Sequence, residues 1–141
     1  MRTLFICVSI LIVFIGCDIS KNENNSFDYS IEQQRNCFCP QAGVWVKLFV
    51  NADTVTDAIR LSDNDHLTYA QRKPYKSIKE LFDLIARFDS TTYNLTIKID
   101  SVNNYPSYIY FNPNPLFNGD TAVFISDAQW SYTTRNYVRL N

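Results

Sequence analysis

Two cysteines one residue apart, Cys37 and Cys39, are the residues of this chain whose type and spacing could do chemistry. In an extended strand both side chains point the same way, and their α-carbons lie about 6.6 Å apart. That spacing is at the far edge of the range that a disulfide can bridge. We therefore treat Cys37 and Cys39 as a candidate disulfide that requires local buckling of the chain and would be strained, and strained disulfides are easier to reduce.

Such a pair could serve thiol exchange or the capture of a soft metal, or it could be a local structural staple. A disulfide that closes so small a loop adds little stability through chain entropy. We favour the staple, or a plain thiol pair, over a redox function. We expect no metal site, because two sulfurs without a matching pair of Cys or His ligands leave the coordination incomplete.

The other candidate chemistry is weaker. Asp63, Asp65 and His66 crowd one segment, but a calcium loop would also need a glycine and a later glutamate, so we favour a solvated turn. The chain has one histidine and three glycines, with no glycine-rich phosphate loop and no Gly-x-Ser-x-Gly motif. We therefore expect no catalytic residues, no cofactor and no enzyme activity.

Length and composition indicate one globular domain. The chain has 141 residues, of which 46% are hydrophobic, 15% aromatic and 19% charged. The formal net charge is -1 and no basic stripe is present, so the chain lacks the electrostatic footprint of a nucleic-acid-binding protein.

The amino terminus predicts a lipoprotein signal peptide over residues 1–16. An apolar run follows Arg2 and is too short to span a bilayer, and Gly16 stands directly before Cys17. This arrangement resembles the lipobox of bacterial lipoproteins, in which the cysteine receives a diacylglyceryl group and becomes the first residue. An ordinary signal peptide cut elsewhere, or an uncleaved anchor, is the less favoured alternative.

The predicted mature chain is held on a membrane by lipid alone. Its location is then extracytoplasmic, on the cell membrane or the outer membrane. Residues 17–26 are polar and predict a solvated tether, and residues 27–141 predict a single folded domain.

Alternating apolar residues predict a sheet of about six antiparallel strands, and helical spacing predicts one main helix. The helix covers residues 77–88, where Ser77 and Glu80 match a capping box. We predict an α+β domain in which this helix packs on one face of the sheet. The expected strands are 27–39, 44–50, 54–61, 95–100, 108–111 and 121–126.

Three segments carry a family resemblance: residues 36–40 (NCFCP), 77–88 (SIKELFDLIARF) and 96–110 (TIKIDSVNNYPSYIY). They resemble a family of small bacterial secreted and lipid-anchored proteins known only as a domain of unknown function, over about residues 29–127. The turn at Asn51-Ala52-Asp53 departs from the Asp-Gly turn usual in that family. The resemblance implies an α+β fold and an extracytoplasmic location, and it implies no activity.

One face of the predicted sheet carries more aromatic residues than is usual for a face exposed to solvent. If the helix covers the face with Val46, Leu48, Ile97 and Ile109, the opposite face carries Trp45, Phe49, Tyr108 and Tyr110. These four residues form either a binding face for an envelope protein or small ligand, or a surface covered by the chain's own tail with Trp130 and Tyr137. We slightly favour the tail. The predicted function is a non-catalytic binding module of the cell envelope, with a thiol redox or metal-handling protein as the alternative.

Overall fold

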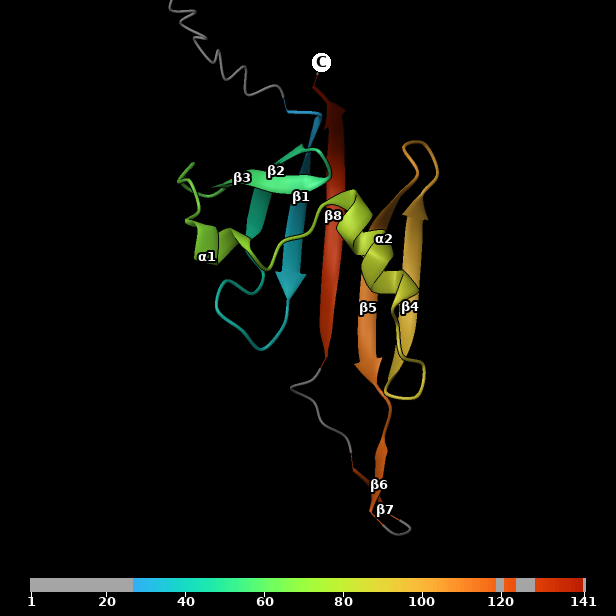
Figure 1. Cartoon of the computed structure of the whole chain (residues 1–141). Coiled ribbons are helices and arrows are strands. Elements are labelled where there is room, and N and C mark those ends of the chain that lie inside the picture. The colour runs from blue at the N-terminus through green and yellow to red at the C-terminus, as the bar shows by residue number, and fades with distance from the viewer. Residues whose placement is uncertain (1–26, 119–120, 124–128, 141) are drawn as a thin grey trace, which may run out of the picture.

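A computed structural model describes residues 27–118, 121–123 and 129–140, which form a six-stranded antiparallel sheet with a small hairpin below it (Figure 1). The order across the sheet is β3-β2-β1-β8-β5-β4, and β6 pairs with β7 in the separate hairpin. The strands are β1 (Tyr29–Asn36), β2 (Trp45–Asn51), β3 (Thr54–Arg60), β4 (Tyr93–Asp100), β5 (Tyr105–Pro113), β6 (Leu116–Asn118), β7 (Thr121–Val123) and β8 (Trp130–Arg139).

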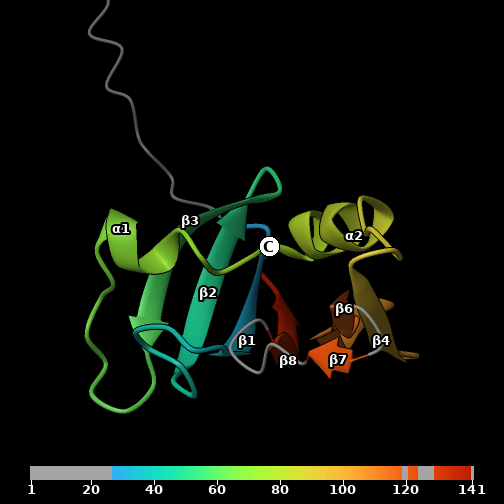
Figure 2. The same ribbon diagram turned by 90° about the horizontal axis from the view of Figure 1, so that it is seen from below.

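The prediction of an α+β domain built on one main helix is wrong. The described residues are mostly sheet, with two short helices, α1 (Tyr69–Arg72) and α2 (Ile78–Ala86). A nine-residue helix is about 13.5 Å long, whereas six strands span about 24 Å between the outer axes. Helix α2 therefore packs on β5 and α1 on β3, on the same side of the sheet, and neither covers that face (Figure 2).

The start of α2 is where its sequence predicts it. The Ser77 hydroxyl accepts a hydrogen bond from the Glu80 amide at 3.2 Å, and the Glu80 carboxylate accepts one from the Ser77 amide at 2.7 Å. Thr68 and Gln71 form the same capping box at α1, which lies between the expected strand 54–61 and the expected helix 77–88. Each short helix is thus fixed at its first turn by side chains.

The side of the sheet that carries the helices buries two apolar clusters. Val46, Leu48 and Val50 of β2 are fully buried in the first, as their alternation predicts. The second cluster joins Leu81 of α2 to buried residues of β5 and β8. Ile97, expected on the covered face, is 37% exposed, because β4 is an outer strand that α2 reaches only in part. The second cluster is Leu81, Ile109, Phe111 and Tyr132.

The carboxy-terminal segment forms the strand in the middle of the sheet, between β1 and β5. Seven register pairs join β8 to β1, and four join it to β5. The strand expected at 121–126 is instead the short β7, outside the main sheet, and residues 124–128 lie outside the described part of the chain.

The hairpin between β2 and β3 turns at Ala52 and Asp53, which have φ angles of 47° and 60°. Two successive residues with positive φ are typical of the tight turns that suit the twist of a hairpin. The Asp28 carboxylate accepts a hydrogen bond from the Ala52 amide at 2.7 Å and holds this turn without glycine.

Buried tyrosines predict loss of stability at alkaline pH. Burial raises the pKa of Tyr75 and of Tyr132 above the ordinary value of 10.0, so the folded chain holds these protons more tightly than the unfolded chain. Each buried tyrosine makes its full contribution to the free energy of unfolding below about pH 10. This contribution is lost as the pH rises from there through the raised pKa, by up to about 1.4 kcal/mol per pH unit for each tyrosine. Urea unfolding between pH 8 and 11 measures this slope.

The two tyrosines differ in their hydroxyl partners. The Tyr132 hydroxyl donates to the Pro74 carbonyl at 2.9 Å, whereas the Tyr75 hydroxyl is buried and finds no partner among the described residues. We expect Tyr132→Phe to lower the free energy of unfolding at pH 7 by about 1 kcal/mol and Tyr75→Phe to raise it by a similar amount. Both variants should flatten the alkaline loss, and an unchanged slope in both would contradict the assignment.

Candidate functional site

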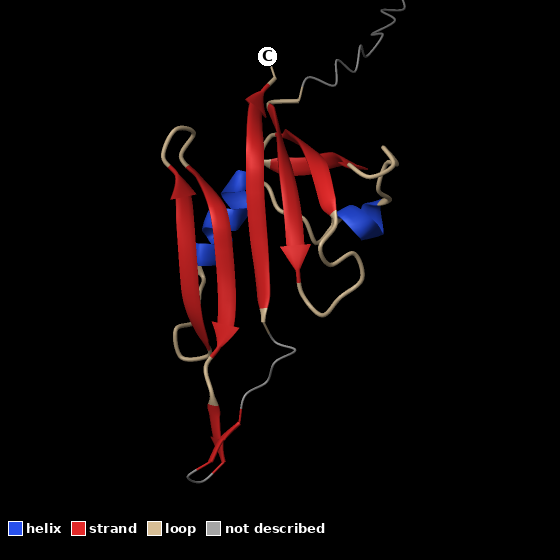
Figure 3. Cartoon of the chain, turned by 180° about the vertical axis from the view of Figure 1, so that it is seen from behind, coloured by secondary structure: helices blue, strands red, loops and turns tan. Residues whose placement is uncertain are grey.

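Figure 3 shows the side of the sheet that the helices leave open. The strand register places the four aromatic residues predicted to form a binding face on that side. Trp45 and Phe49 belong to β2, and Tyr108 and Tyr110 belong to β5. Strands β1 and β8 separate these pairs, so Trp45 and Tyr108 are about 14 Å apart across three strand spacings. The face therefore carries two aromatic groups instead of one cluster.

The two aromatic rings on β2 are covered by neighbouring side chains, two of them cationic and one aromatic. The Arg135 guanidinium lies 3.8 Å from the centroid of the Trp45 ring, and its Nε donates to the Glu32 carboxylate at 2.9 Å. Phe27 and Lys47 cover Phe49, at 4.9 Å between ring centroids and 5.4 Å from ammonium to centroid. These rings are half-buried and already have partners, so they leave little free aromatic surface.

The group on β5 borders a hollow at one end of the sheet. The rings of Tyr108 and Tyr110 stack at 6.4 Å between centroids, and the Lys98 ammonium lies 5.8 Å from the Tyr108 centroid. Tyr110 lines a hollow of about 280 Å³ together with Phe38 and Trp130. The predicted face thus continues from Tyr110 into a concave site at the end of the sheet.

The interpretation that Trp130 and Tyr137 of the tail cover the aromatic face is wrong. Trp130 stacks on Phe111 at 3.7 Å between centroids, and Tyr137 packs against Tyr29 at 5.4 Å. Phe111 and Tyr29 belong to the buried clusters on the side of the helices. The tail is a strand of the sheet, so its large aromatic rings fill the core beneath the helices.

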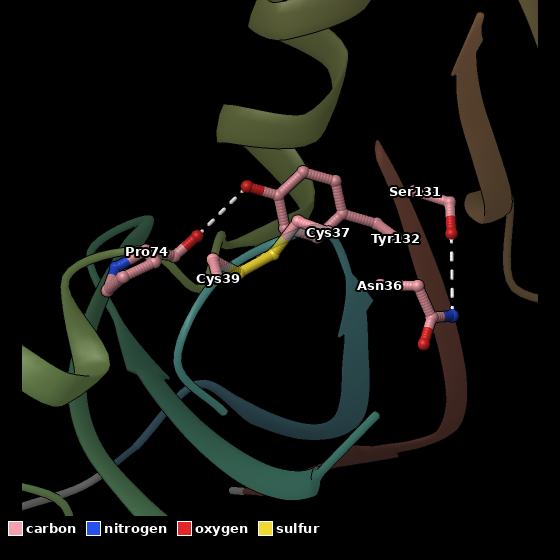
Figure 4. Close-up of a disulfide and its surroundings, with 6 residues drawn as sticks. All are labelled: Asn36, Cys37, Cys39, Pro74, Ser131 and Tyr132. Atoms are coloured by element: carbon pink, nitrogen blue, oxygen red, sulfur yellow. Dashed lines mark hydrogen bonds between the residues drawn. A yellow bond between two sulfur atoms is a disulfide. The ribbon is translucent and has the colours of Figure 1, made fainter. Parts of the chain in front are cut away.

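Cys37 and Cys39 are joined by a disulfide in the turn that follows β1 (Figure 4). The Cys39 amide donates to the Cys37 carbonyl at 2.9 Å, and this bend brings the α-carbons to 5.2 Å. The strand ends at Asn36, so the chain makes the local buckle that the spacing requires. Phe38, at the tip of this loop, is 86% exposed.

Hydrogen bonds fix the base of the disulfide loop. The Asn36 amide group donates to the Ser131 hydroxyl at 3.5 Å, and the Gly43 amide donates to the Arg35 carbonyl at 2.7 Å. Gly43 has a φ of 76°, a conformation that glycine adopts without strain. The loop is therefore anchored to β1 and β8 while Phe38 projects into solvent.

Two hollows flank the loop and share Phe38 and Trp130 in their walls. The first is the hollow of about 280 Å³ on the open side. The second, of about 490 Å³, is on the side of the helices and adds the cations Arg35 and Lys76. Phe38 is not among the site residues predicted from the sequence, although an aromatic residue between two cysteines is a signal that could have indicated it.

A family model described as a family of unknown function, DUF6174, matches residues 21–134. The chain belongs to the DUF6174 family. This confirms the resemblance drawn from the sequence, and the match includes β1, the disulfide loop and the first half of β8. No curated protein and no solved structure matches this DUF6174 chain.

The acidic segment of this DUF6174 protein is occupied by internal ion pairs. The Arg60 guanidinium lies 2.6 Å from the Asp63 carboxylate, and this hydrogen bond lowers the pKa of Asp63. His66 turns toward Asp57, with Nδ1 at 3.1 Å from the carboxylate. Residues 27–118, 121–123 and 129–140 contain no group of three or more His, Cys, Asp or Glu side chains that could hold a metal ion.

The predicted signal peptide, the lipidation of Cys17 and the tether of residues 17–26 lie outside the described residues. Within the described part of the chain, no helix is long and apolar enough to cross a membrane.

Proposed function

We propose that this DUF6174 chain is a lipid-anchored, non-catalytic binding module of the bacterial cell envelope, with an envelope protein as its partner. The observation that carries the proposal is Phe38, a large apolar side chain that is 86% exposed on a loop closed by a disulfide. An ordered loop holds such a residue at little entropic cost to binding. Exposed aromatic residues beside concave sites are typical anchors of protein interfaces.

The position of the loop relative to the tether supports this function. The folded domain begins at Phe27, next to the end of β8, and the disulfide loop lies at the opposite end of β1 (Figure 1). Eight strand residues separate these ends by about 26 Å. A lipid on Cys17 and a tether that enters at Phe27 would direct Phe38 and the two hollows away from the membrane.

The anchor is tested by replacing Cys17. We expect Cys17→Ser to abolish acylation and cleavage before residue 17, so that the protein is no longer held by lipid. Mass spectrometry of the mature wild-type amino terminus checks the expectation directly. An unmodified Cys17, or a mature chain that starts at another residue, would contradict the lipoprotein assignment.

The binding end is tested by photo-crosslinking in intact cells. A photoreactive phenylalanine analogue replaces Phe38 in one variant and Val102 in the other. Val102 is an almost equally exposed control, at 85%, in the turn between β4 and β5 at the end of the sheet near Phe27. We expect position 38 to crosslink to a discrete envelope protein that is not this chain, and position 102 to crosslink to no such protein.

Two further variants make this result interpretable. Phe38→Ser should remove the partner from a native purification with a change in unfolding free energy within about 0.5 kcal/mol, because an exposed side chain contributes little to the core. Equal crosslinking of positions 38 and 102 to a protein other than this chain would refute the binding end. A phenotype that depends on both sulfurs, lost in the Cys37→Ser and Cys39→Ser double variant but kept in Phe38→Ser, would favour the thiol redox alternative.

A further inference from the structure

Strand β4 is an outer strand of the sheet and lacks most of the features that protect an exposed edge. It is eight residues long, and no described strand lies beyond it. Natural sheets protect such edges with charged side chains, proline, bulges or very short strands, and β4 has only the first of these features, in Lys98 and its last residue, Asp100. β4 contains no proline, and the irregularity opposite Lys98 places the extra residue, Ser107, in β5. The backbone of β4 is therefore regular along its open side.

Two hydrogen bonds show which residues of β4 direct their backbone groups outward. The Asn114 amide donates to the Thr92 carbonyl at 2.8 Å, and the Ser107 hydroxyl donates to the Lys98 carbonyl at 3.1 Å. Thr92 and Lys98 thus face β5. Because backbone groups alternate along an antiparallel strand, the odd-numbered residues direct their N–H and C=O groups to the open edge.

The same odd-numbered residues carry the apolar side chains of β4. Ile97 is 37% exposed and Ile99 is 46% exposed, while Leu95 packs in part against the cluster beneath α2. The three residues form an apolar stripe that is evenly spaced about Ile97. A two-fold axis at Ile97 would place this stripe against itself, which is the self-complementarity that a symmetric interface requires.

We propose that the β4 edge pairs with the β4 edge of a second copy of this chain, antiparallel and with Ile97 opposite Ile97. Leu95 then faces Ile99 of the second copy, and the two sheets become one, with the helices of both copies on the same side. Unpaired backbone groups on each edge supply the hydrogen bonds.

The charges of the edge fit this register. Lys98 faces Thr96 of the second copy, and Asp100 faces Asn94, so no like charges stand directly opposite each other. Like charges directly opposite would destabilise the pair. The register thus buries the exposed isoleucines and leaves the charged side chains with neutral neighbours.

The test uses the full chain in its native membranes, with Ile97→Cys compared with Lys98→Cys under mild oxidation. Directly opposite residues at position 97 have α-carbons about 5.5 Å apart, within disulfide range. Two copies of residue 98 are diagonal, about 8 Å apart, beyond that range. We expect at least a five-fold higher yield of disulfide-linked dimer from Ile97→Cys on a non-reducing gel.

A second measurement does not depend on an engineered thiol. Light scattering of the detergent-extracted protein should give the mass of a dimer for the wild type and half that protein mass for Ile97→Lys. Equal crosslinking yields from positions 97 and 98, or a monomeric wild type, would overturn the proposal. A monomer that crosslinks from position 97 to a different protein would assign the edge to a foreign strand and would also overturn it.

Discussion

A chain that ends after Gln129 is expected not to fold, because the missing residues form β8, the strand at the centre of the sheet. Without β8 no register pair links the β3-β2-β1 half to the β5-β4 half. The buried side chains of Ser131, Tyr132 and Thr134 are lost with it. The remaining hairpin and three-stranded piece lack a shared core, and isolated hairpins are marginal in water. Circular dichroism and urea titration should show no cooperative unfolding transition.

The matched control ends after Arg139 and removes only the last two residues. The Leu140 amide donates to the Asp28 carbonyl at 3.0 Å, and the loss of this bond should lower the free energy of unfolding by about 1 kcal/mol or less. A cooperative transition in the chain that ends after Gln129 would show that β8 is dispensable, and the central position of the strand would then not determine folding.

Local features of this fold could be predicted because their causes are local. The alternation of Val46, Leu48 and Val50 specifies a strand and its buried face. Ser77 and Glu80 specify the first turn of α2 through hydrogen bonds within four residues. The spacing of Cys37 and Cys39 likewise predicts the buckle that their disulfide requires.

The place of β8 could not be predicted, because strand pairing joins residues far apart in the sequence. Gln33 lies opposite Thr134, about a hundred positions later. The tail also forms an irregular strand, since Asn136 has a positive φ of 54° and Arg135 is exposed. Its residues therefore do not follow a simple alternation of buried and exposed positions. Without knowledge of its strand partners, the aromatic tail is therefore interpreted as a segment that covers the sheet, whereas it is the central strand.

The arrangement of the candidate site could not be predicted for the same reason, because it depends on which strands pair. Alternation places Trp45 and Tyr108 on one face, and both do lie there, but it does not give the number of strands between them. The two intervening strands, β1 and β8, come from opposite ends of the folded chain. Their insertion separates the aromatic groups and brings Arg135 onto Trp45. It also places Trp130 beside Phe38, a contact region that no local pattern indicates.

Gln33→Leu is expected to destabilise the domain by about 3 kcal/mol, although it replaces a polar core residue with an apolar one. Gln33 is fully buried on the side of the helices. Its side-chain amide donates to the Lys76 carbonyl at 3.0 Å, and its side-chain carbonyl accepts from the Lys76 amide at 2.9 Å. The substitution leaves both backbone groups of Lys76 without these partners, in a segment that must stay partly buried to position α2. Urea unfolding monitored by fluorescence measures the loss.

Gln34→Leu is the matched control, because the adjacent side chain points to the open face. Gln34 donates to the Gly43 carbonyl at 2.6 Å in an exposed setting, where water can replace it, so we expect a loss of about 1 kcal/mol or less. A similar loss in both variants would attribute the effect to β-strand pairing instead of the Lys76 contacts. A loss confined to Gln33→Leu would mean that one buried amide, invisible to a hydrophobic pattern, fixes the segment between α1 and α2 on the sheet.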